Sequence, residues 1–240
     1  MIATLLAGTV TLMSYNIHSG WGAEGQKWNL GEPIAAIKRA APDVCTLNEV
    51  SWGGEAKGFN VDQPAIMGHI LAPIWRTARG TAMKRTGDAE YGNAILFSAK
   101  ELSQETLSLP GRKESRILVA VEFPDYWIAT THLSLHEEER LKSVPIIADW
   151  AAKKTKPVLL TGDWNAEPDT ATIAEMKKHF TILSDTNVKT FSTMRPHATI
   201  DYIAVDTAHA NKVRVVSQSV PDERTGSDHF PIVMKLDVAP

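Results

Sequence analysis

The sequence predicts a protein of mixed α and β structure in which many short strands are interleaved with a few helices. Three observations support this fold class. Several apolar runs are short enough for buried strands, fewer segments repeat apolar residues at helical spacing, and Gly and Pro separate them without a repeat or a low-complexity linker. The 240 residues can bury a substantial core, and we expect one domain spanning residues 1–240.

Polar residues are expected at the ends of several strands. The apolar runs predict strands at residues 9–17, 43–50, 91–98, 117–123, 127–133, 157–160, 200–205, 213–216 and 231–238. The first of these ends at Asn16, and the second carries Glu49 near its far end. Residues 157–160 lead through Gly162, which allows a sharp turn, to Asp163 and Asn165. Residues two apart in extended chain project to the same side, so Asp163 and Asn165 can face one cleft.

Helices are predicted at residues 32–40, 135–151 and about 170–179. The first has an acid and a proline in its opening turn, and Pro42 stops it. In the second, Pro145 is expected to kink or restart the helix. The links among the three strands between residues 91 and 133 favour an antiparallel meander over parallel crossovers.

The region from Ser51 to Glu90 is expected to be irregular, and it holds the main concentration of basic residues: Arg76, Arg79, Lys84 and Arg85. A solvated loop is the favoured interpretation of such charges. If the substrate is anionic, however, this loop is where we expect phosphate contacts. The net charge of −3 provides no global basic field to attract nucleic acid.

The remaining composition is that of a soluble globular protein, with 43% hydrophobic and 22% charged residues. Residues 1–8 are apolar, but they lack a basic region and are too few for a signal peptide or a membrane span. We therefore expect no integral membrane segment and a cytoplasmic monomer, with a secreted or periplasmic protein as the alternative if a leader has been removed. Cys45 is the single cysteine, which excludes an intramolecular disulfide, and its apolar neighbours indicate an inert core thiol.

The acidic and amide residues at strand ends, with two histidines beside strand boundaries, suit a hard divalent cation and phosphate chemistry. Mg²⁺ prefers oxygen ligands and uses one or two protein carboxylates together with substrate phosphate. Glu49 and Asp228 can supply those carboxylates, and Asn16 can supply a neutral oxygen. His229 can take a proton from water if a carboxylate such as Asp201 orients its ring. Taken singly, each of these residues is better explained as a cap, an ion-pair partner or a structural histidine.

Seven short motifs in a fixed order favour the functional interpretation. They are Ser14-Tyr15-Asn16-Ile17, Leu47-Asn48-Glu49-Val50, Tyr91-Gly92-Asn93-Ala94-Ile95-Leu96, Thr131-His132-Leu133, Gly162-Asp163-Trp164-Asn165, Ile200-Asp201-Tyr202-Ile203 and Ser227-Asp228-His229-Phe230-Pro231. From about Val10 to Val238 the chain resembles the endonuclease/exonuclease/phosphatase superfamily. That group includes pancreatic-type deoxyribonucleases, abasic-site endonucleases, neutral sphingomyelinases and inositol-polyphosphate 5-phosphatases. One departure is Asn48, which stands where the family usually has a glutamine, and its shorter side chain bears on the geometry beside Glu49.

The resemblance implies a four-layer αββα sandwich, with two mostly antiparallel sheets face to face and helices outside. It also implies that Glu49 binds a catalytic Mg²⁺ or Mn²⁺, with Asn16 and Asp228 nearby in the metal and phosphate site. His229, paired with Asp201, is implied to be the general base or the histidine that contacts phosphate.

Three further roles follow from the resemblance. Asp163 is implied to orient or activate water for in-line attack, and Asn165 to donate to a phosphate oxygen. His132 is implied to stabilise the developing charge or to protonate the leaving oxygen. Metal ions and donors aimed at the transition state supply most of the rate in phosphoryl transfer.

The expected function is hydrolysis of a phosphodiester or phosphomonoester, with a small or lipid-derived substrate favoured. A nuclease acting on DNA or RNA is the alternative. It needs a basic groove, for which only residues 76–85 with Arg112 and Lys113 offer charge, and Trp21 or Trp52 would have to stack on a base. A membrane-acting sphingomyelinase needs an exposed apolar insertion loop, which we do not find. A non-catalytic binding module should lack a ligand or a histidine, and none is missing.

Overall fold

Two six-stranded sheets organise the computed structural model, which describes residues 8–23, 27–54, 61–71 and 75–239. The first sheet has the order β11-β12-β1-β2-β4-β3, and the second β5-β6-β7-β8-β10-β9. The strands of the first sheet are β1 (Gly8–Asn16), β2 (Val44–Trp52), β3 (Arg76–Lys84), β4 (Glu90–Phe97), β11 (Val213–Ser219) and β12 (Ile232–Val238). Those of the second are β5 (Ser103–Leu109), β6 (Arg116–Glu122), β7 (Trp127–Thr131), β8 (Val158–Asp163), β9 (Phe180–Ile182) and β10 (Asp201–Asp206). Neighbours are antiparallel except β1 with β2 and β7 with β8.

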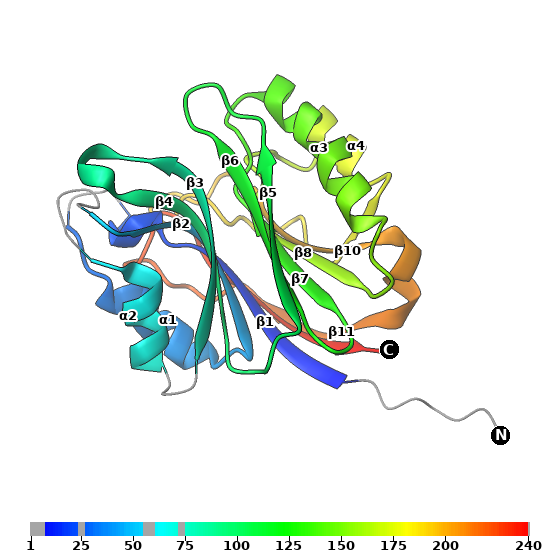
Figure 1. The fold of residues 1–240 in the computed structure, drawn as a ribbon, viewed down its shortest axis with the longest axis horizontal. Helices are drawn as coiled ribbons and strands as arrows, with labels where there is room; N and C mark the ends of the chain where they lie inside the picture. Colours follow the sequence, from blue (N-terminus) through cyan, green and yellow to red (C-terminus); the bar gives the residue numbers. More distant parts are fainter. Residues whose placement is uncertain (1–7, 24–26, 55–60, 72–74, 240) are drawn as a thin grey trace.

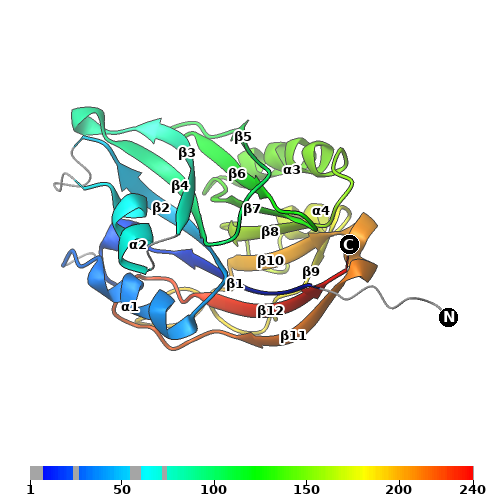
Figure 2. The ribbon, with the colours of Figure 1, turned by 60° about the horizontal axis from the view of Figure 1, so that its bottom comes forward.

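Helices cover the outer faces of the two sheets, as Figure 1 shows, and Figure 2 gives a second view of the layers. The helices are α1 (Gly31–Ala40), α2 (Gln63–Leu71), α3 (Glu137–Ala151) and α4 (Ala171–Met176). Short 3-10 segments are η1 (His18–Gly20), η2 (Thr86–Asp88) and η3 (Thr207–Lys212). α1 and α2 lie against the first sheet, and α3 and α4 against the second. The expected four-layer sandwich of mostly antiparallel sheets is confirmed.

Three apolar cores hold the layers together, and the two-residue period of the strands assigns side chains to them. Leu12 packs between the sheets, while the next residue, Met13, packs toward α1 and α2. In the second sheet Leu159 faces the first sheet and Leu160 faces α3 and α4. Burying a leucine contributes about 1.5–3 kcal/mol. Strands that are buried on both faces therefore read as continuous apolar runs, which is why the sequence predicted them.

The structure corrects the prediction of an irregular region from Ser51 to Glu90. Its described parts contain α2, η2 and β3, and β3 pairs with β4 along its length. β3 lies at the edge of its sheet and turns small residues toward the second sheet. A Cβ added at Gly80 would lie 2.4 Å from Val119 Cγ2 on β6, and Ala78 is buried nearby. Close approach of the sheets therefore selects small residues here, and the strand lacks the large apolar residues that would have marked it.

Other differences are smaller. β5 and β9 were not predicted, and β4 belongs to the first sheet, so the expected meander holds only for β6 and β7. Pro145 lies inside α3, which continues through it without a break. α4 is shorter than expected, beginning after Thr170 and ending at Met176.

Two expectations concern compartment and reactivity. No helix in the described ranges is long and apolar enough to cross a bilayer, and residues 1–7 lie outside the described residues. Cys45 is buried, and burial raises the pKa of its thiol, in agreement with an inert core cysteine.

Candidate active site

The eight predicted site residues converge at one end of the facing sheets. They are Asn16, Glu49, His132, Asp163, Asn165, Asp201, Asp228 and His229. Direct contacts link seven of them into one network. The eighth, Asp228, lines the same cavity as its neighbour His229. Segments that are far apart in the sequence therefore form one polar site.

A β-bulge presents Glu49 to this site. The pairing of β2 with β4 shifts register between Leu47 and Val50, which leaves Asn48 and Glu49 outside the regular ladder. Glu49 has a φ of 56°, in the left-handed region that a glutamate seldom adopts. Bulges commonly re-aim a side chain next to an active site, and backbone strain of this kind concentrates at functional positions.

Asn48, the departure from the family motif, bridges the two sheets. Its Oδ1 accepts a hydrogen bond from the Asp163 backbone N–H at 3.0 Å. Its Nδ2 donates to Asn93 Oδ1 at 2.9 Å and to Thr130 Oγ1 at 3.2 Å. Asn48 is fully buried, so these partners are what make its burial tolerable. The shorter side chain still holds the strand end that carries Asp163 beside the bulge that carries Glu49.

Asp163 lies at the end of β8, directly after Gly162, whose backbone conformation is one that only glycine adopts readily. Gly162 has a φ of 125°, and a Cβ there would lie 2.0 Å from the carbonyl oxygen of Thr131. Asp163 Oδ1 then accepts from the Asn165 backbone N–H at 2.9 Å, and Oδ2 accepts from Asn16 Nδ2 at 3.0 Å. Burial raises the pKa of the Asp163 carboxyl, against the opposing effect of the neighbouring histidines.

His229 is held between two carboxylates. Its Nδ1 is 2.9 Å from Asp201 Oδ2, its Nε2 is 3.5 Å from Asp163 Oδ2, and the Phe191 ring packs at a centroid distance of 4.9 Å. Burial lowers the pKa of His229, but the charges of Asp201 and Asp163 outweigh burial and raise it to about 10. In the metal-free protein the ring is therefore an imidazolium near neutral pH.

Asp163, Asp201 and His229 approach one another closely enough to surround an ion, since one ligand atom from each lies within 4.8 Å of the others. An imidazolium, however, has no lone pair to offer a metal. The hydrogen bond from His229 to Asp201 also uses one ring nitrogen. This group is better described as an imidazolium between two acids, which leaves Glu49 and Asp228 as the more suitable carboxylates for a cation.

His132 has the opposite electrostatic environment. Arg116 Nη1 donates to His132 Nδ1 at 3.3 Å, and Asn165 Nδ2 lies 2.9 Å from Nε2. Burial lowers the pKa of His132, Asp163 opposes this change, and Arg116 adds to it. Burial and the Arg116 guanidinium thus favour the neutral ring, although Asp163 Oδ2 lies 3.5 Å from Nε2.

Asn16 connects the two halves of the site through its amide nitrogen. Nδ2 donates to Glu49 Oε1 at 3.1 Å and to Asp163 Oδ2 at 3.0 Å, while Oδ1 accepts from the His18 backbone N–H at 3.0 Å. The nitrogen of the amide thus faces the carboxylates, and its oxygen already accepts one hydrogen bond.

The cavity has a volume of about 330 Å³ and includes residues that the sequence interpretation did not select. The added lining residues are Tyr91, Glu114, Arg116, Leu135, Phe191 and Ile200. Arg85 also lines the cavity, and it belongs to the basic stretch where phosphate contacts were expected for an anionic substrate. Arg116 carried one usable signal, a charge placed directly before an apolar strand. Phe191 carried none, because its place depends on the fold of the loop before β10.

Three of the six basic residues proposed for a nucleic-acid groove pair with carboxylates. Arg76 contacts Glu101 and Arg79 contacts Asp62, each at 2.6 Å. Arg112 pairs with Glu138 and, at 3.1 Å, with Glu139. Trp52 is buried and donates to Glu90, so it is not available to stack on a base.

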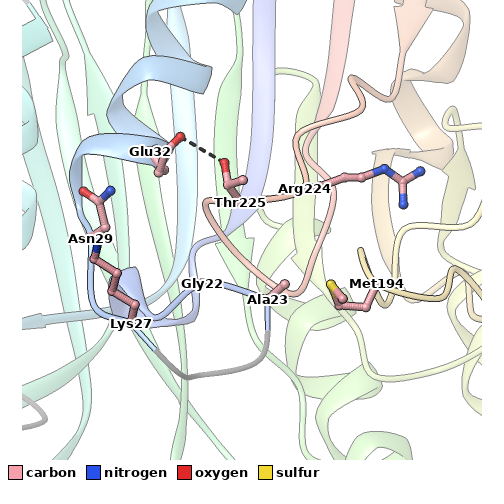
Figure 3. Close-up of a pocket in the computed structure, with 8 residues that line it drawn as sticks. All are labelled: Gly22, Ala23, Lys27, Asn29, Glu32, Met194, Arg224 and Thr225. Atoms are coloured by element: carbon pink, nitrogen blue, oxygen red, sulfur yellow. Dashed lines mark hydrogen bonds between the residues drawn. The ribbon is translucent and has the colours of Figure 1, made fainter.

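A second pocket, of about 350 Å³, adjoins the loop that leads to Asp228 (Figure 3). Thr225 Oγ1 donates to Glu32 Oε2 at 2.9 Å across it. Lys27 and Arg224 lie on opposite sides, and Arg224 points away from Lys27. The lining residues are Gly22, Ala23, Lys27, Asn29, Glu32, Met194, Arg224 and Thr225. Its mixed charge favours no single class of ligand.

The fold is the phosphoesterase fold of a known family. The chain belongs to the endonuclease/exonuclease/phosphatase family, whose model matches residues 13–229. Nucleases and phosphatases, which hydrolyse phosphate esters, make up this family.

Individual relatives extend the match over nearly the whole chain. The uncharacterized protein YbhP of Escherichia coli strain K12 is 23% identical over 242 residues, covering 94% of this chain and 95% of its own. An endonuclease/exonuclease/phosphatase structure from Beutenbergia cavernae has a TM-score of 0.77 at 23% identity, covering 96% of this chain and 72% of its own. The mannosyl-6-phosphatase Bt3783 of Bacteroides thetaiotaomicron has a TM-score of 0.72 at 18% identity, covering 95% and 99%. These structural similarities establish the fold.

Proposed function

We propose that this protein is an Mg²⁺- or Mn²⁺-dependent phosphoesterase that hydrolyses a phosphodiester or phosphomonoester by in-line attack of water. The observation that carries the proposal is the bulge at Glu49, whose left-handed backbone turns a carboxylate into the cavity where Asp163 and His229 meet. The strained backbone of Glu49 and the buried charges of His229 and its two acids are all unfavourable for stability, so a role in function explains them better than a structural role.

The residues present suit a divalent cation. Four carboxylates line the cavity, those of Glu49, Glu114, Asp163 and Asp228. Three cations oppose them, the guanidinium groups of Arg85 and Arg116 and the imidazolium of His229. An anionic phosphate entering this cavity meets an excess of negative charge that a divalent cation offsets. Carboxylate oxygens are also the ligands that Mg²⁺ and Mn²⁺ prefer.

Glu49 and Asp228 would hold the ion, and Asn16, as predicted from the family motif, would add its amide oxygen. Because Asn16 Nδ2 contacts Glu49 and Asp163, the arrangement supports a role in orienting these carboxylates more directly than one as a ligand. When bound, the ion would supply Lewis-acid polarisation of a phosphate oxygen and charge neutralisation.

The protonation states suggest how the other residues share the chemistry. Asp163, whose pKa burial raises, is the better candidate to take a proton from the attacking water. His229, held as an imidazolium by Asp201, would instead donate to a phosphate oxygen, which favours its phosphate-contacting role over that of general base. Asn165 would donate to the same phosphate as charge develops.

His132 is favoured as a neutral group that stabilises charge near the leaving oxygen. Burial and the Arg116 guanidinium oppose an imidazolium that could act as an acid. With His132 neutral, the leaving oxygen would receive a proton either from solvent or from Asp163, which gained one from the attacking water.

Substrates smaller than nucleic acid are favoured. The net charge is −3, and two of the four cations of the predicted basic stretch, Arg76 and Arg79, pair with carboxylates. The similarity to a protein named as a mannosyl-6-phosphatase adds sugar phosphates to the candidates. A nuclease stays the alternative, because the same site chemistry cleaves nucleic-acid diesters.

The test is hydrolysis of a substrate panel in Mg²⁺, Mn²⁺ or EDTA. The panel contains bis-p-nitrophenyl phosphate, p-nitrophenyl phosphate, mannose 6-phosphate, sphingomyelin, plasmid DNA, single-stranded DNA and RNA. His229→Ala should abolish turnover while far-UV circular dichroism stays native. The matched control is His136→Ala, which removes an exposed histidine outside the cavity and should change nothing.

Metal-dependent cleavage of small esters with DNA untouched would support the phosphoesterase, and rapid plasmid nicking that is lost in His229→Ala would favour the nuclease. Near-normal turnover by His229→Ala would remove this residue from the mechanism. Activity that persists in EDTA would contradict the metal requirement. A protein inactive on every substrate would return attention to a binding module.

A further inference from the structure

Arg85 is the residue of the basic stretch that reaches the active-site cavity. Arg76 and Arg79 point to carboxylates elsewhere, whereas Arg85 lines the cavity. Its guanidinium lies over the ring of Tyr91, 3.8 Å from the centroid. Among the residues that the structure describes, no carboxylate pairs with Arg85. Stacking on a buried ring holds the planar group in one orientation and leaves its charge unneutralised.

Arg116 lines the same cavity and shares a second property with Arg85. Arg116 is only 4% exposed, and its Nη1 donates to Glu114 Oε1 at 2.9 Å and to His132 Nδ1 at 3.3 Å. In both arginines, however, Nε is buried and has no hydrogen-bond partner in the described part of the chain. Buried donors without acceptors are unfavourable. Both arginines line one cavity, and the described residues do not satisfy all of their donors, a combination that suits an acceptor-rich ligand.

The strand order places both arginines on the side of the cavity away from His229, although Arg116 also contacts His132. Across the first sheet, β12 follows His229, β1 ends at Asn16, β2 carries Glu49, β4 carries Tyr91, and β3 leads to Arg85. Neighbouring strands are about 4.8 Å apart, so β3 is about 10 Å from β2. In the second sheet β6, which begins at Arg116, likewise lies beyond β7 and β8 on the side away from β10. The strands next to the arginines, β3 and β6, thus lie on the side of the two sheets away from β12 and β10.

We propose that Arg85 and Arg116 bind a second phosphate group of the substrate, one that is not cleaved. This inference rests on the proposed function, which assigns the scissile phosphate to Glu49, Asp163 and His229. Glu114 neutralises one of the two guanidinium charges, which leaves a net positive charge at this end of the cavity. Phosphate oxygens match the donor geometry of guanidinium groups. The second phosphate can belong to a small bisphosphate or to the adjacent nucleotide of a nucleic acid, and the chemistry of the contact is the same.

The kinetic test uses two substrates that differ by one phosphate. The p-nitrophenyl ester of thymidine 5′-phosphate is compared with the same ester carrying a 3′-phosphate, so that the leaving group and the scissile bond are unchanged. The 3′-phosphate should lower KM by about tenfold or more, as expected for charged hydrogen bonds. Arg85→Gln should remove most of that advantage, and Arg85→Lys should restore part of it. Lys84→Gln, which removes an adjacent exposed charge outside the cavity, should retain the advantage in full.

Two further arms identify the source of the second phosphate. Glucose 1,6-bisphosphate is compared with glucose 6-phosphate, and a single-stranded tetranucleotide with a dinucleotide. An Arg85-dependent preference in the sugar pair assigns the subsite to a small bisphosphate, and one in the oligonucleotide pair assigns it to a nucleic acid. A second phosphate that leaves KM unchanged, or an Arg85→Gln effect equal on both members of every pair, would overturn the proposal.

A binding measurement separates failure of the subsite from failure of the proposed function. Inorganic phosphate is titrated calorimetrically into the protein in EDTA, where neither metal nor turnover contributes. Arg85→Gln should raise Kd by about tenfold, and Lys84→Gln should leave it unchanged. Equal Kd values for the wild type and Arg85→Gln, or no binding by the wild type, would reject the subsite whether or not the protein is an enzyme.

Discussion

Replacing Gly162 by alanine is expected to destabilise the protein through two separable effects. The backbone φ at Gly162 is +125°, a conformation that L residues rarely adopt, and such strain costs about 1–3 kcal/mol. The added Cβ would also lie 2.0 Å from the carbonyl oxygen of Thr131, so the backbone has to shift. Overpacking of this kind costs about 1–3 kcal/mol. The sum is about 2–6 kcal/mol, a large fraction of the typical 5–15 kcal/mol of a folded domain.

Two other glycines serve as controls because each isolates one effect. Gly53 has a φ of +60° and nothing within 4 Å of an added Cβ, so Gly53→Ala tests backbone conformation alone and should cost about 1–2 kcal/mol. At Gly92 the φ is not positive, but an added Cβ would lie 2.0 Å from the carbonyl oxygen of Gly80. Gly92→Ala therefore tests overlap alone and should cost about 1–3 kcal/mol.

The assay is equilibrium unfolding in urea, followed by tryptophan fluorescence and far-UV circular dichroism. With a slope of about 2 kcal/mol per M, a loss of about 4 kcal/mol lowers the midpoint for Gly162→Ala by about 2 M. Turnover should fall as well, because Gly162 precedes Asp163 and their shared backbone has to move. If the urea midpoint of Gly162→Ala were not below the midpoints of both Gly53→Ala and Gly92→Ala, the reasoning would be refuted.

Three further changes have defined outcomes. The pKa of His229 is raised from 6.5 to about 10, which contributes stability that is complete below pH 6.5 and is lost as the pH rises through 10. Asp201→Asn should lower this pKa, so thermal melts of the metal-free variant should show the loss of stability beginning at a lower pH than in the wild type. Identical pH profiles of the two proteins would exclude the pairing of His229 with Asp201. Mg²⁺ should raise the Tm of the wild type but not of Glu49→Gln, and equal shifts would remove Glu49 as a ligand. Asn48→Leu leaves the Asp163 N–H and a polar partner on Asn93 unpaired and should cost about 2–4 kcal/mol in urea unfolding; a cost below about 0.5 kcal/mol would show that these hydrogen bonds contribute little to stability.

Local sequence patterns were sufficient for the strands that form the centre of each sheet. β8 and β10 are buried on both faces, so their apolar runs, such as Val158–Leu160, stand out without knowledge of their neighbours. The edge strands β3 and β5 escaped prediction because half of their surface contacts solvent or small residues such as Gly80. The edge strand β11 was predicted at residues 213–216, because its valines mark it without reference to its partner.

The chemical groups of the site were also predictable from the chain alone. Carboxylates, amides and histidines follow strand ends, and the order of the seven motifs identified Glu49 and His229 as members of one constellation. The structure brought together all eight residues that the sequence singled out. It added Arg116, and it selected Arg85 from the basic stretch in which the sequence had placed possible phosphate contacts.

The sequence by itself determined which ionisable groups this protein can use, and the tertiary structure decided their charge. His132 and His229 have similar local surroundings in the sequence, since each lies beside a strand boundary. In the fold, burial lowers the pKa of His132 against the opposing charge of Asp163, and Arg116 adds to the lowering. At His229 the charges of Asp201 and Asp163 outweigh burial and raise the pKa. Protonation depends on burial and on charges within a few ångströms. Those charges come from strands far away in the chain, so only the packing of the two sheets assigns the two histidines opposite states.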